Sequence, residues 1–341
     1  MITQRDIARK IGVSSTTVSR VLSNTDTSIP ISDKTREKIL AAVKELGYRP
    51  NLFAKSLRTK KTNLIGVVVW DLTDPFFSEI LQAIEQVLDK SGYMMLLSNA
   101  GGRTAREKLC LEKMSDFRVD GMLIVGGAET LSKEELSKLN LNTQRIVLVG
   151  TRSNRMDLSS ITIDNYTGGY IGTEHLIKHN RKRLIYISGS EKTIDMEDRL
   201  LGVKAAIGKY GLEERFDILE VRRGEQEGYT AAQRMLKYVA TPVAILADND
   251  TTGLGVVRAV KDAELRIPED VAVVGFDDLS ICNYMEPRLS TVHQPRAEMG
   301  EIGAEMLVKT LNTIDKTPEK DHPKKVLSPR LIIRESSLRL D

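Results

Sequence analysis

Apolar residues near the start of the chain recur at the three- and four-residue spacing of a helix face. Three separate stripes lie within residues 1–49, each long enough for a few helical turns. The pattern predicts three short helices, each with one buried face. The stripes are Ile7 with Ile11, then Val18 with Val21 and Leu22, and then Ile39 with Val43 and Leu46.

The residues between these stripes carry signals that begin and end helices. Gly12 can end the first helix, and Ser14 can cap the second by accepting hydrogen bonds from free backbone N–H groups. Ser32 can cap the third helix, which Gly47 can end. The sequence therefore predicts a helix, a tight turn and two further helices over residues 1–49. Residues 50–63 form a polar linker with too few apolar residues to bury itself.

From Leu64 onward, apolar runs of strand length alternate with helical segments. Such runs are typical of parallel strands covered on both faces, in sheets that bind ligands beyond the carboxyl ends of their strands. The remaining length, about 280 residues, is enough for two lobes. We therefore expect an α/β body of two lobes with parallel sheets. The runs are residues 64–69, 93–98, 121–125, 146–149, 184–188, 243–247 and 271–276.

Positive charge is concentrated at one end of the chain. Residues 1–62 contain 13 lysine or arginine and 5 aspartate or glutamate residues, a net charge of +8. The other residues contain 37 and 42, a net charge of −5. A basic module on a mildly acidic body is typical of a protein whose small end meets a polyanion. Charge alone also fits an ordinary solvated surface.

Composition narrows the class of protein further. Hydrophobic residues make up 41% and charged residues 28% of the chain, which is typical of a folded globular protein. Cys110 and Cys282 are too few for a disulfide framework or a four-cysteine zinc site. No secretory apolar region follows Arg5 and Arg9, and no apolar run reaches the roughly 18 residues of a membrane span. We therefore expect a cytoplasmic protein.

The second helix is the candidate for reading DNA. In a helix-turn-helix, this element enters the major groove with its N-terminus first, where hydroxyl side chains and an arginine can reach base edges and phosphates. The same residues would also suit a solvent-exposed helix face. With the apolar stripe turned inward, the outward side chains are Ser15, Thr16, Ser19 and Arg20.

Ordered motifs throughout the chain closely resemble those of LacI/GalR-family transcription regulators. In the head they are Asp6-Ile7-Ala8, Gly12-Val13-Ser14, Thr17-Val18-Ser19-Arg20-Val21-Leu22, Thr35-Arg36-Glu37-Lys38-Ile39 and Glu45-Leu46-Gly47-Tyr48-Arg49-Pro50-Asn51. In the body they include Ile65-Gly66-Val67-Val68, Asp74-Pro75-Phe76-Phe77, Val119-Asp120-Gly121, Asp164-Asn165, Glu174-His175-Leu176, Arg199 with Gly202, Asn249-Asp250, Pro268-Glu269-Asp270-Val271, Val274-Gly275-Phe276-Asp277-Asp278, Thr291-Val292-His293-Gln294-Pro295 and Arg334-Glu335-Ser336.

The resemblance implies a homodimer that binds double-stranded operator DNA. Residues 51–58 would form a hinge helix in the minor groove, with Leu57 as a wedge between base pairs, a role that suits an apolar residue in a basic stretch. Packing of Leu57 on the body is the alternative. The loop at residues 25–31 is longer than in the family pattern, which leaves its phosphate contacts open. The DNA-binding candidates are Ser14, Ser15, Thr16, Thr17, Ser19, Arg20, Asn24, Tyr48, Asn51, Ala54, Leu57 and Arg58.

For the body, the resemblance implies a periplasmic-binding-protein-like fold of two lobes joined by crossovers near Ile163, Gln294 and Val326. The first lobe would hold residues 64–163 plus 295–326, and the second residues 164–294 plus 327–341, with a small-molecule effector between them. Aromatic, amide and charged side chains there would suit a hydroxylated ligand, although core packing is the alternative for the two phenylalanines. The residues at the family's pocket positions are Asp74, Phe76, Phe77, Arg199, Asn249 and Asp277.

Two departures from the family pattern bear on the effector. Gly150 stands where many members have an aspartate, and Arg223 precedes Gly228 where several have an aromatic residue. With Arg103 on a loop near the cleft, we add Arg103 and Arg223 to the effector candidates and favour a sugar acid or sugar phosphate. A neutral sugar or a nucleobase-type co-repressor is the alternative, because Arg223 could instead point to solvent. The expected function is ligand-responsive repression of carbohydrate metabolism genes.

An enzyme and a sugar-binding protein without DNA activity are the other classes considered. His175 and His179 have the spacing of a zinc pair, but no glutamate lies between them as a general base. The chain lacks GxSxG and P-loop patterns, and Gly168, Gly169 and Gly172 lie at a helix start, where small residues favour packing. We expect no catalytic residue, metal or cofactor. The basic head and the missing signal peptide disfavour a periplasmic binding protein.

Overall fold

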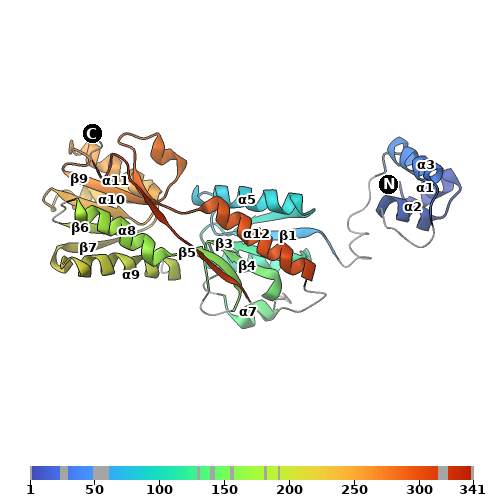
Figure 1. The fold of residues 1–341 in the computed structure, drawn as a ribbon, viewed down its shortest axis with the longest axis horizontal. Coiled ribbons are helices and arrows are strands. Elements are labelled where there is room, and N and C mark those ends of the chain that lie inside the picture. The colour runs from blue at the N-terminus through green and yellow to red at the C-terminus, as the bar shows by residue number, and fades with distance from the viewer. Residues whose placement is uncertain are drawn as a thin grey trace. The chain divides into compact units, whose positions relative to one another are not determined.

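The computed structural model divides into two compact units, residues 1–62 and residues 63–341 (Figure 1). It describes residues 2–23, 30–48, 61–128, 131–138, 143–153, 157–179, 183–190, 193–313 and 322–338. None of the described helices is both long and apolar enough to cross a membrane.

The first unit contains the three expected helices, α1 (Gln4–Ile11), α2 (Ser15–Ser23) and α3 (Asp33–Glu45). Ile7, Val18 and Ile39, one from each helix, are fully buried in a shared core. The predicted helix signals are confirmed. Gly12 ends α1 in the left-handed conformation, with φ of 76°. Ser14 Oγ accepts a hydrogen bond of 3.0 Å from the backbone N–H of Thr17, and Ser32 caps α3.

The first lobe of the second unit is a six-stranded sheet in the order β11-β5-β4-β3-β1-β2. All its strand pairs are parallel. Helices α5 (Phe76–Lys90) and α12 (Arg296–Thr313) lie side by side on one face (Figure 1), while α6 (Thr104–Asp116) and α7 (Lys133–Lys138) cover the other. The strands are β1 (Leu64–Val69), β2 (Met94–Asn99), β3 (Gly121–Val125), β4 (Ile146–Val149), β5 (Ser159–Ile163) and β11 (Lys324–Leu327).

The second lobe is a six-stranded sheet in the order β12-β10-β9-β8-β6-β7. Only the pairing of β10 with β12 is antiparallel among the described strands. One face carries α8 (Asn165–Lys178) and α9 (Ile194–Lys209), and the other carries α10 (Glu225–Met235) and α11 (Asp250–Asp262). The strands are β6 (Leu184–Gly189), β7 (Phe216–Val221), β8 (Val243–Ala247), β9 (Val271–Asp277), β10 (Ser290–His293) and β12 (Arg330–Ile332).

Helices on both faces explain why the central strands are apolar at successive positions. In β1, the neighbours Val67 and Val68 are both fully buried but belong to cores on opposite faces of the sheet. A strand that faced solvent on one side would instead alternate apolar and polar residues. The predicted fold class, a helix-turn-helix head and a two-lobed body with parallel sheets, is confirmed.

The described chain passes between the two sheets three times. It leaves the first sheet after β5, returns between β10 and α12, and leaves it again between β11 and β12. The residues after β12 then pack into the second lobe. Arg334 Nη1 donates to the backbone oxygen of Leu289 at 2.7 Å, and Ser336 Oγ donates to that of Val273 at 2.7 Å. Late segments of the chain therefore complete both lobes.

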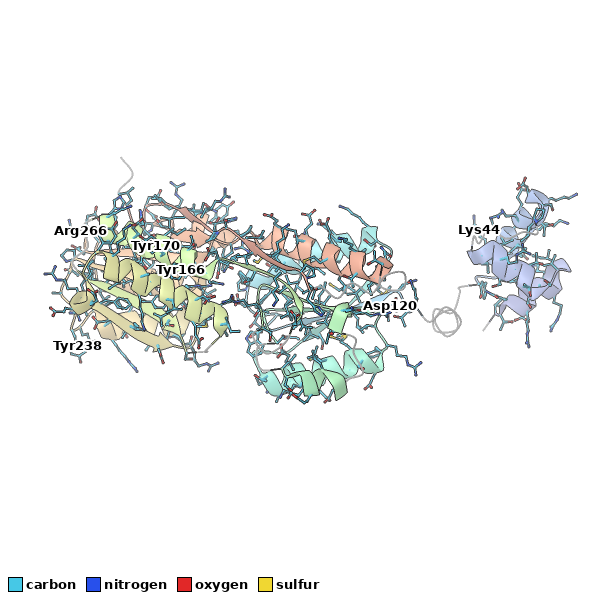
Figure 2. The ribbon with its side chains drawn as sticks, turned by 60° about the horizontal axis from the view of Figure 1, so that its bottom comes forward. Lys44, Asp120, Tyr166, Tyr170, Tyr238 and Arg266 are labelled. Carbon is cyan, nitrogen blue, oxygen red and sulfur yellow. The ribbon has the colours of Figure 1, made fainter. Side chains whose placement is uncertain are left out.

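Helices α8 and α9 approach each other closely because glycines line their contact. A Cβ atom on Gly169 would lie 2.1 Å from the backbone oxygen of Arg199, and one on Gly202 would lie 1.9 Å from that of Tyr166. The prediction that small residues here serve packing is confirmed. On the outer side of α8, where Tyr166 and Tyr170 project (Figure 2), Lys209 Nζ of α9 donates to Tyr170 Oη at 2.7 Å.

Candidate effector pocket and DNA-binding helix

The surface of α2 has the polarity expected of a DNA-reading helix. Ser15 and Thr16 are exposed, whereas Val18 and Val21 are buried against α1 and α3. Ser19 and Arg20 are partly exposed. The first turn of α2 thus presents hydroxyl groups to solvent, and an arginine follows one turn later. Their contact with DNA stays a prediction.

Of the other eight predicted DNA-binding residues, the structure describes three. Ser14 Oγ lies 2.8 Å from Thr17 Oγ1 and also accepts from the backbone N–H of Thr17, so Ser14 caps the N-terminus of α2. Tyr48 packs against the core of the head. Five candidates lie outside the described residues, namely Asn24, Asn51, Ala54, Leu57 and Arg58.

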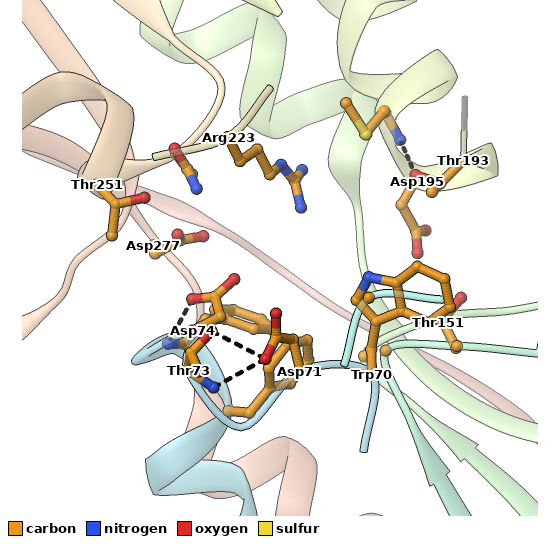
Figure 3. Close-up of a pocket in the computed structure, with 18 of the residues that line it drawn as sticks. Trp70, Asp71, Thr73, Asp74, Thr151, Thr193, Asp195, Arg223, Thr251 and Asp277 are labelled. Atoms are coloured by element: carbon orange, nitrogen blue, oxygen red, sulfur yellow. Dashed lines mark hydrogen bonds between the residues drawn. The ribbon is translucent and has the colours of Figure 1, made fainter. Parts of the chain in front are cut away.

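All eight predicted effector-binding residues line one cavity in the second unit, with a volume of about 550 Å³. It lies where several strands end, among them β1, β4 and β9, which is the usual ligand position in open α/β sheets. Residues from both lobes face each other across it (Figure 3). The eight are Asp74, Phe76, Phe77, Arg103, Arg199, Arg223, Asn249 and Asp277.

Arg199 is held rigidly in the wall of the cavity. Its side chain is buried, and the guanidinium carbon lies 3.4 Å from the centre of the Phe276 ring. Nε and Nη2 donate to Asn165 Oδ1 at 3.3 and 2.9 Å, and Nη1 donates to the backbone oxygen of Asp248. Burial lowers the pKa of Arg199 from its usual value. The guanidinium is therefore oriented before any ligand arrives.

Arg223 extends into the cavity (Figure 3), so the alternative that it points away to solvent does not hold. Its Nε donates to Asp248 Oδ2 at 2.8 Å. Burial by itself lowers the pKa of Arg223, but the ion pair with Asp248 and the nearby carboxylates of Asp277 and Asp74 raise it above its usual value. Its terminal nitrogens are free of the ion pair with Asp248.

Asp74 and Asp277 bring carboxyl groups from opposite lobes to the cavity. Asp74 Oδ1 accepts from the backbone N–H of Phe76 at 2.9 Å, and Asp277 Oδ1 accepts from Gln294 Nε2 at 2.6 Å. Burial raises the pKa of Asp74. Burial and the neighbouring Asp250 raise that of Asp277 well above its usual range. Such carboxyl groups can donate as well as accept hydrogen bonds when protonated.

The remaining predicted residues shape the cavity. Asn249 caps α11, where its Oδ1 accepts from the backbone N–H of Thr252 at 3.0 Å. The rings of Phe76 and Phe77 meet edge to face, with centroids 5.1 Å apart. Phe77 belongs to the core of the first lobe, which confirms core packing for one of the two. Arg103 is exposed at the start of α6.

Sequence reasoning missed several polar and aromatic residues of the cavity. Trp70 and Thr151 follow β1 and β4, and Glu107 and Asp195 lie in the first turns of α6 and α9. Asp195 Oδ1 accepts from Thr162 Oγ1 at 3.3 Å and from Asn165 Nδ2 at 3.1 Å, and burial raises its pKa to about 6. The available signal was that each lies between the carboxyl end of a strand and the first turn of the next helix.

Glu107 is a buried carboxyl group that lines the cavity. Its side chain is 1% exposed, and Oε1 accepts from the backbone N–H of Ala128 at 2.8 Å. Burial raises the pKa of Glu107. It lies on the same face of α6 as the buried residues Cys110 and Leu111, so its burial was visible in the spacing.

The two histidines of α8 have partners within the protein. His175 Nε2 lies 2.7 Å from Ser337 Oγ, and His179 Nδ1 lies 2.8 Å from the backbone oxygen of His175. Burial lowers the pKa of His175 to about 4. Among the described residues, no group of three or more potential metal ligands is present.

Comparison with known proteins identifies both units. Residues 3–51 match the bacterial regulatory proteins of the lacI family, and residues 173–337 match the periplasmic binding protein-like domain. The transcriptional regulator RegA of Clostridium saccharobutylicum is 34% identical over 336 residues, which cover 98% of each chain. The chain belongs to the lacI family of transcriptional regulators.

Two further proteins are similar to this chain over nearly its whole length. The ribose operon repressor of Haemophilus influenzae is 31% identical over 338 residues, again covering 98% of each chain. The structure of the Lac repressor dimer bound to operator and an anti-inducer superposes with a TM-score of 0.85 and 26% identity over 99% of each chain. The protein is thus a ligand-responsive DNA-binding repressor of the lacI family and not an enzyme.

Proposed function

We propose that this repressor binds a near-palindromic operator as a homodimer and regulates genes of carbohydrate metabolism. The Lac repressor structure, a dimer on its operator, supports the assembly. The exposed hydroxyl groups and Arg20 on α2 support base and phosphate contacts. The single observation that carries the effector response is that all eight candidate residues line one cavity between the two lobes.

We further propose that the effector is a sugar acid or sugar phosphate held by Arg223. The guanidinium of Arg223 projects into the cavity, and only its Nε is engaged by Asp248. The terminal nitrogens can therefore grip a carboxylate or phosphate through two parallel hydrogen bonds. Thr251 and Asn249 line the same wall and can bind hydroxyl groups.

A neutral sugar is the second candidate, and the charge of the cavity favours it. Carboxyl groups outnumber arginines among the described lining residues, and Asp248 already neutralises Arg223. Carboxyl groups such as those of the half-buried Asp74 and the buried Asp277 pair well with hydroxyl groups, and each repels a bound anion when ionised. One relative is named for the ribose operon.

Matched ligand pairs distinguish the two candidates. Calorimetry would compare gluconate with glucose, and ribose 5-phosphate with ribose, using the full chain. The anionic proposal requires the charged member of a pair to bind more tightly and Arg223→Gln to remove that preference. Arg222→Gln is the control, because Arg222 is exposed at the rim of the same cavity. Tighter binding of the neutral member would support the second candidate.

Operator binding is tested separately from effector chemistry. Phosphate contacts release counterions, so operator affinity should fall linearly on a plot of log affinity against log salt. A duplex selected from random DNA for binding to the protein would be compared by gel shift with a scrambled duplex of equal length. Equal affinity for both duplexes would contradict sequence-specific repression.

A further inference from the structure

A salt bridge joins the two lobes at the edge of the effector cavity. Arg152 follows β4 of the first lobe, and Asp198 lies on α9 of the second. Arg152 Nη2 donates to Asp198 Oδ2, and the two side chains are 39% and 31% exposed. The pair therefore spans the two lobes and remains in contact with solvent.

A second contact between the lobes lies on the same face of α9. Thr162 Oγ1, from β5 of the first lobe, donates to Asp195 Oδ1 at 3.3 Å. Asp195 and Asp198 are three residues apart on α9, which places them on one side of the helix. The first turns of α9 thus carry two polar groups that meet the first lobe.

Both ends of the salt bridge are directly connected to residues of the cavity. Thr151, next to Arg152, and Arg199, next to Asp198, line the cavity. Separation of the lobes would break the salt bridge and move Arg199 away from the strand-end loop of the first lobe. The salt bridge is therefore formed only when the lobes are close together, and its attraction opposes opening of the cavity.

We infer that Arg152 and Asp198 form a latch that holds the lobes together before an effector enters. A latch of this kind raises the population of the closed, binding-competent form and strengthens effector binding by the same factor. The inference needs only the cavity and the two lobes, so it stands independently of the effector's chemistry.

The expected size of the effect follows from the exposure of the pair. Partly exposed ion pairs contribute modestly, so loss of this one should change the ratio of open to closed lobes about two- to five-fold. Salt screens exposed charges, with a Debye length of about 10 Å at 0.1 M and about 3 Å at 1 M. Added salt should therefore open the wild-type cavity and have little effect once the latch is removed.

Trp70 provides a direct readout of the latch without any effector. It is the only tryptophan of the chain, and it lines the cavity (Figure 3). Quenching of its fluorescence by acrylamide, a neutral probe, measures how accessible the cavity is. The full chain would be compared with Arg152→Gln, Asp198→Asn and the charge swap Arg152→Asp with Asp198→Arg.

Each single variant should show a higher quenching constant than the wild type, and the charge swap should restore a value near that of the wild type. Salt should raise quenching in the wild type and in the charge swap but not in the single variants. Arg183→Gln is the matched control, because Arg183 and Asp217 form an exposed ion pair within the second lobe. Unchanged quenching in both single variants, or no response of the wild type to salt, would overturn the latch. An equal rise in Arg183→Gln would attribute the change to general loosening and also overturn it.

Discussion

Asp195 should make the stability of the effector-binding unit depend on pH. Burial at the edge of the cavity raises its pKa to about 6 in the folded protein, against about 3.9 in an unfolded chain. The folded state therefore binds this proton more tightly. The free energy of unfolding contributed by Asp195 should fall as pH rises from about 4 to about 6, and should stay constant above that range.

The size of this contribution follows from the pKa difference. Two pKa units correspond to about 3 kcal/mol, as an order of magnitude. Asp195→Asn removes the charge and keeps an oxygen that can accept from Thr162 and Asn165. Relative to the wild type, we expect the variant to gain up to about 3 kcal/mol at pH 7 and almost nothing at pH 4.

Urea unfolding at pH 4, 5, 6 and 7, followed by the fluorescence of Trp70, would measure this difference. Trp70 reports on the effector-binding unit alone, because the head contains no tryptophan. Asp89→Asn, an exposed aspartate at the end of α5, controls for the loss of a charge. A stability difference that does not vary with pH, or a variant less stable than the wild type at pH 7, would refute the argument.

Four further substitutions test other parts of the molecule. Arg20→Ala should weaken operator binding by about 1–3 kcal/mol for each lost base contact, and unchanged affinity in a gel-shift series would count against α2 as the reading helix. Leu57→Ala should reduce operator bending and specific affinity but preserve the salt dependence of nonspecific binding; a parallel loss of both affinities would assign Leu57 to the fold. Arg199→Ala should abolish the effector response measured by calorimetry while operator affinity without effector persists, whereas a retained response would remove Arg199 from the site. Gly202→Ala places a Cβ 1.9 Å from the backbone oxygen of Tyr166 and should cost about 1–3 kcal/mol or more in denaturant unfolding, so a stable variant would contradict the close contact of α8 and α9.

Local patterns predicted the elements of the fold because the central strands are buried on both faces. Strands such as β1, β3 and β8 are continuous apolar runs, and they begin and end at the predicted residues. Strands β5 and β7 do not stand out, because β5 begins with two serines and β7, at the edge of its sheet, is only partly buried. Strand β5 is placed by pairing with both β4 and the late strand β11, and β7 is placed by pairing with β6.

The effector cavity was predicted only in part for a related reason. The family resemblance supplied Arg199, Asn249 and Asp277, which line the cavity. Trp70 follows a strand and Asp195 lies in the first turn of the helix after one, but residues of a surface loop can have the same position. Only the order of the strands brings these two residues together at the cavity. The same is true of Arg152 and Asp198, which are 46 residues apart and belong to different lobes.

Because the chain passes between the sheets three times and is synthesised from its N-terminus, strands of both sheets are made late. Strand β11 is the edge of the first sheet and β12 is the edge of the second, and both are made after residue 320. Arg334 and Ser336, which bind buried backbone groups of the second lobe, emerge later still. A nascent chain still on the ribosome holds two unfinished sheets whose edges are open to pairing with other chains. A ribosome that stalls before residue 324 would leave both sheets without these strands, so the demand for chaperones should depend on how quickly residues 324–336 emerge.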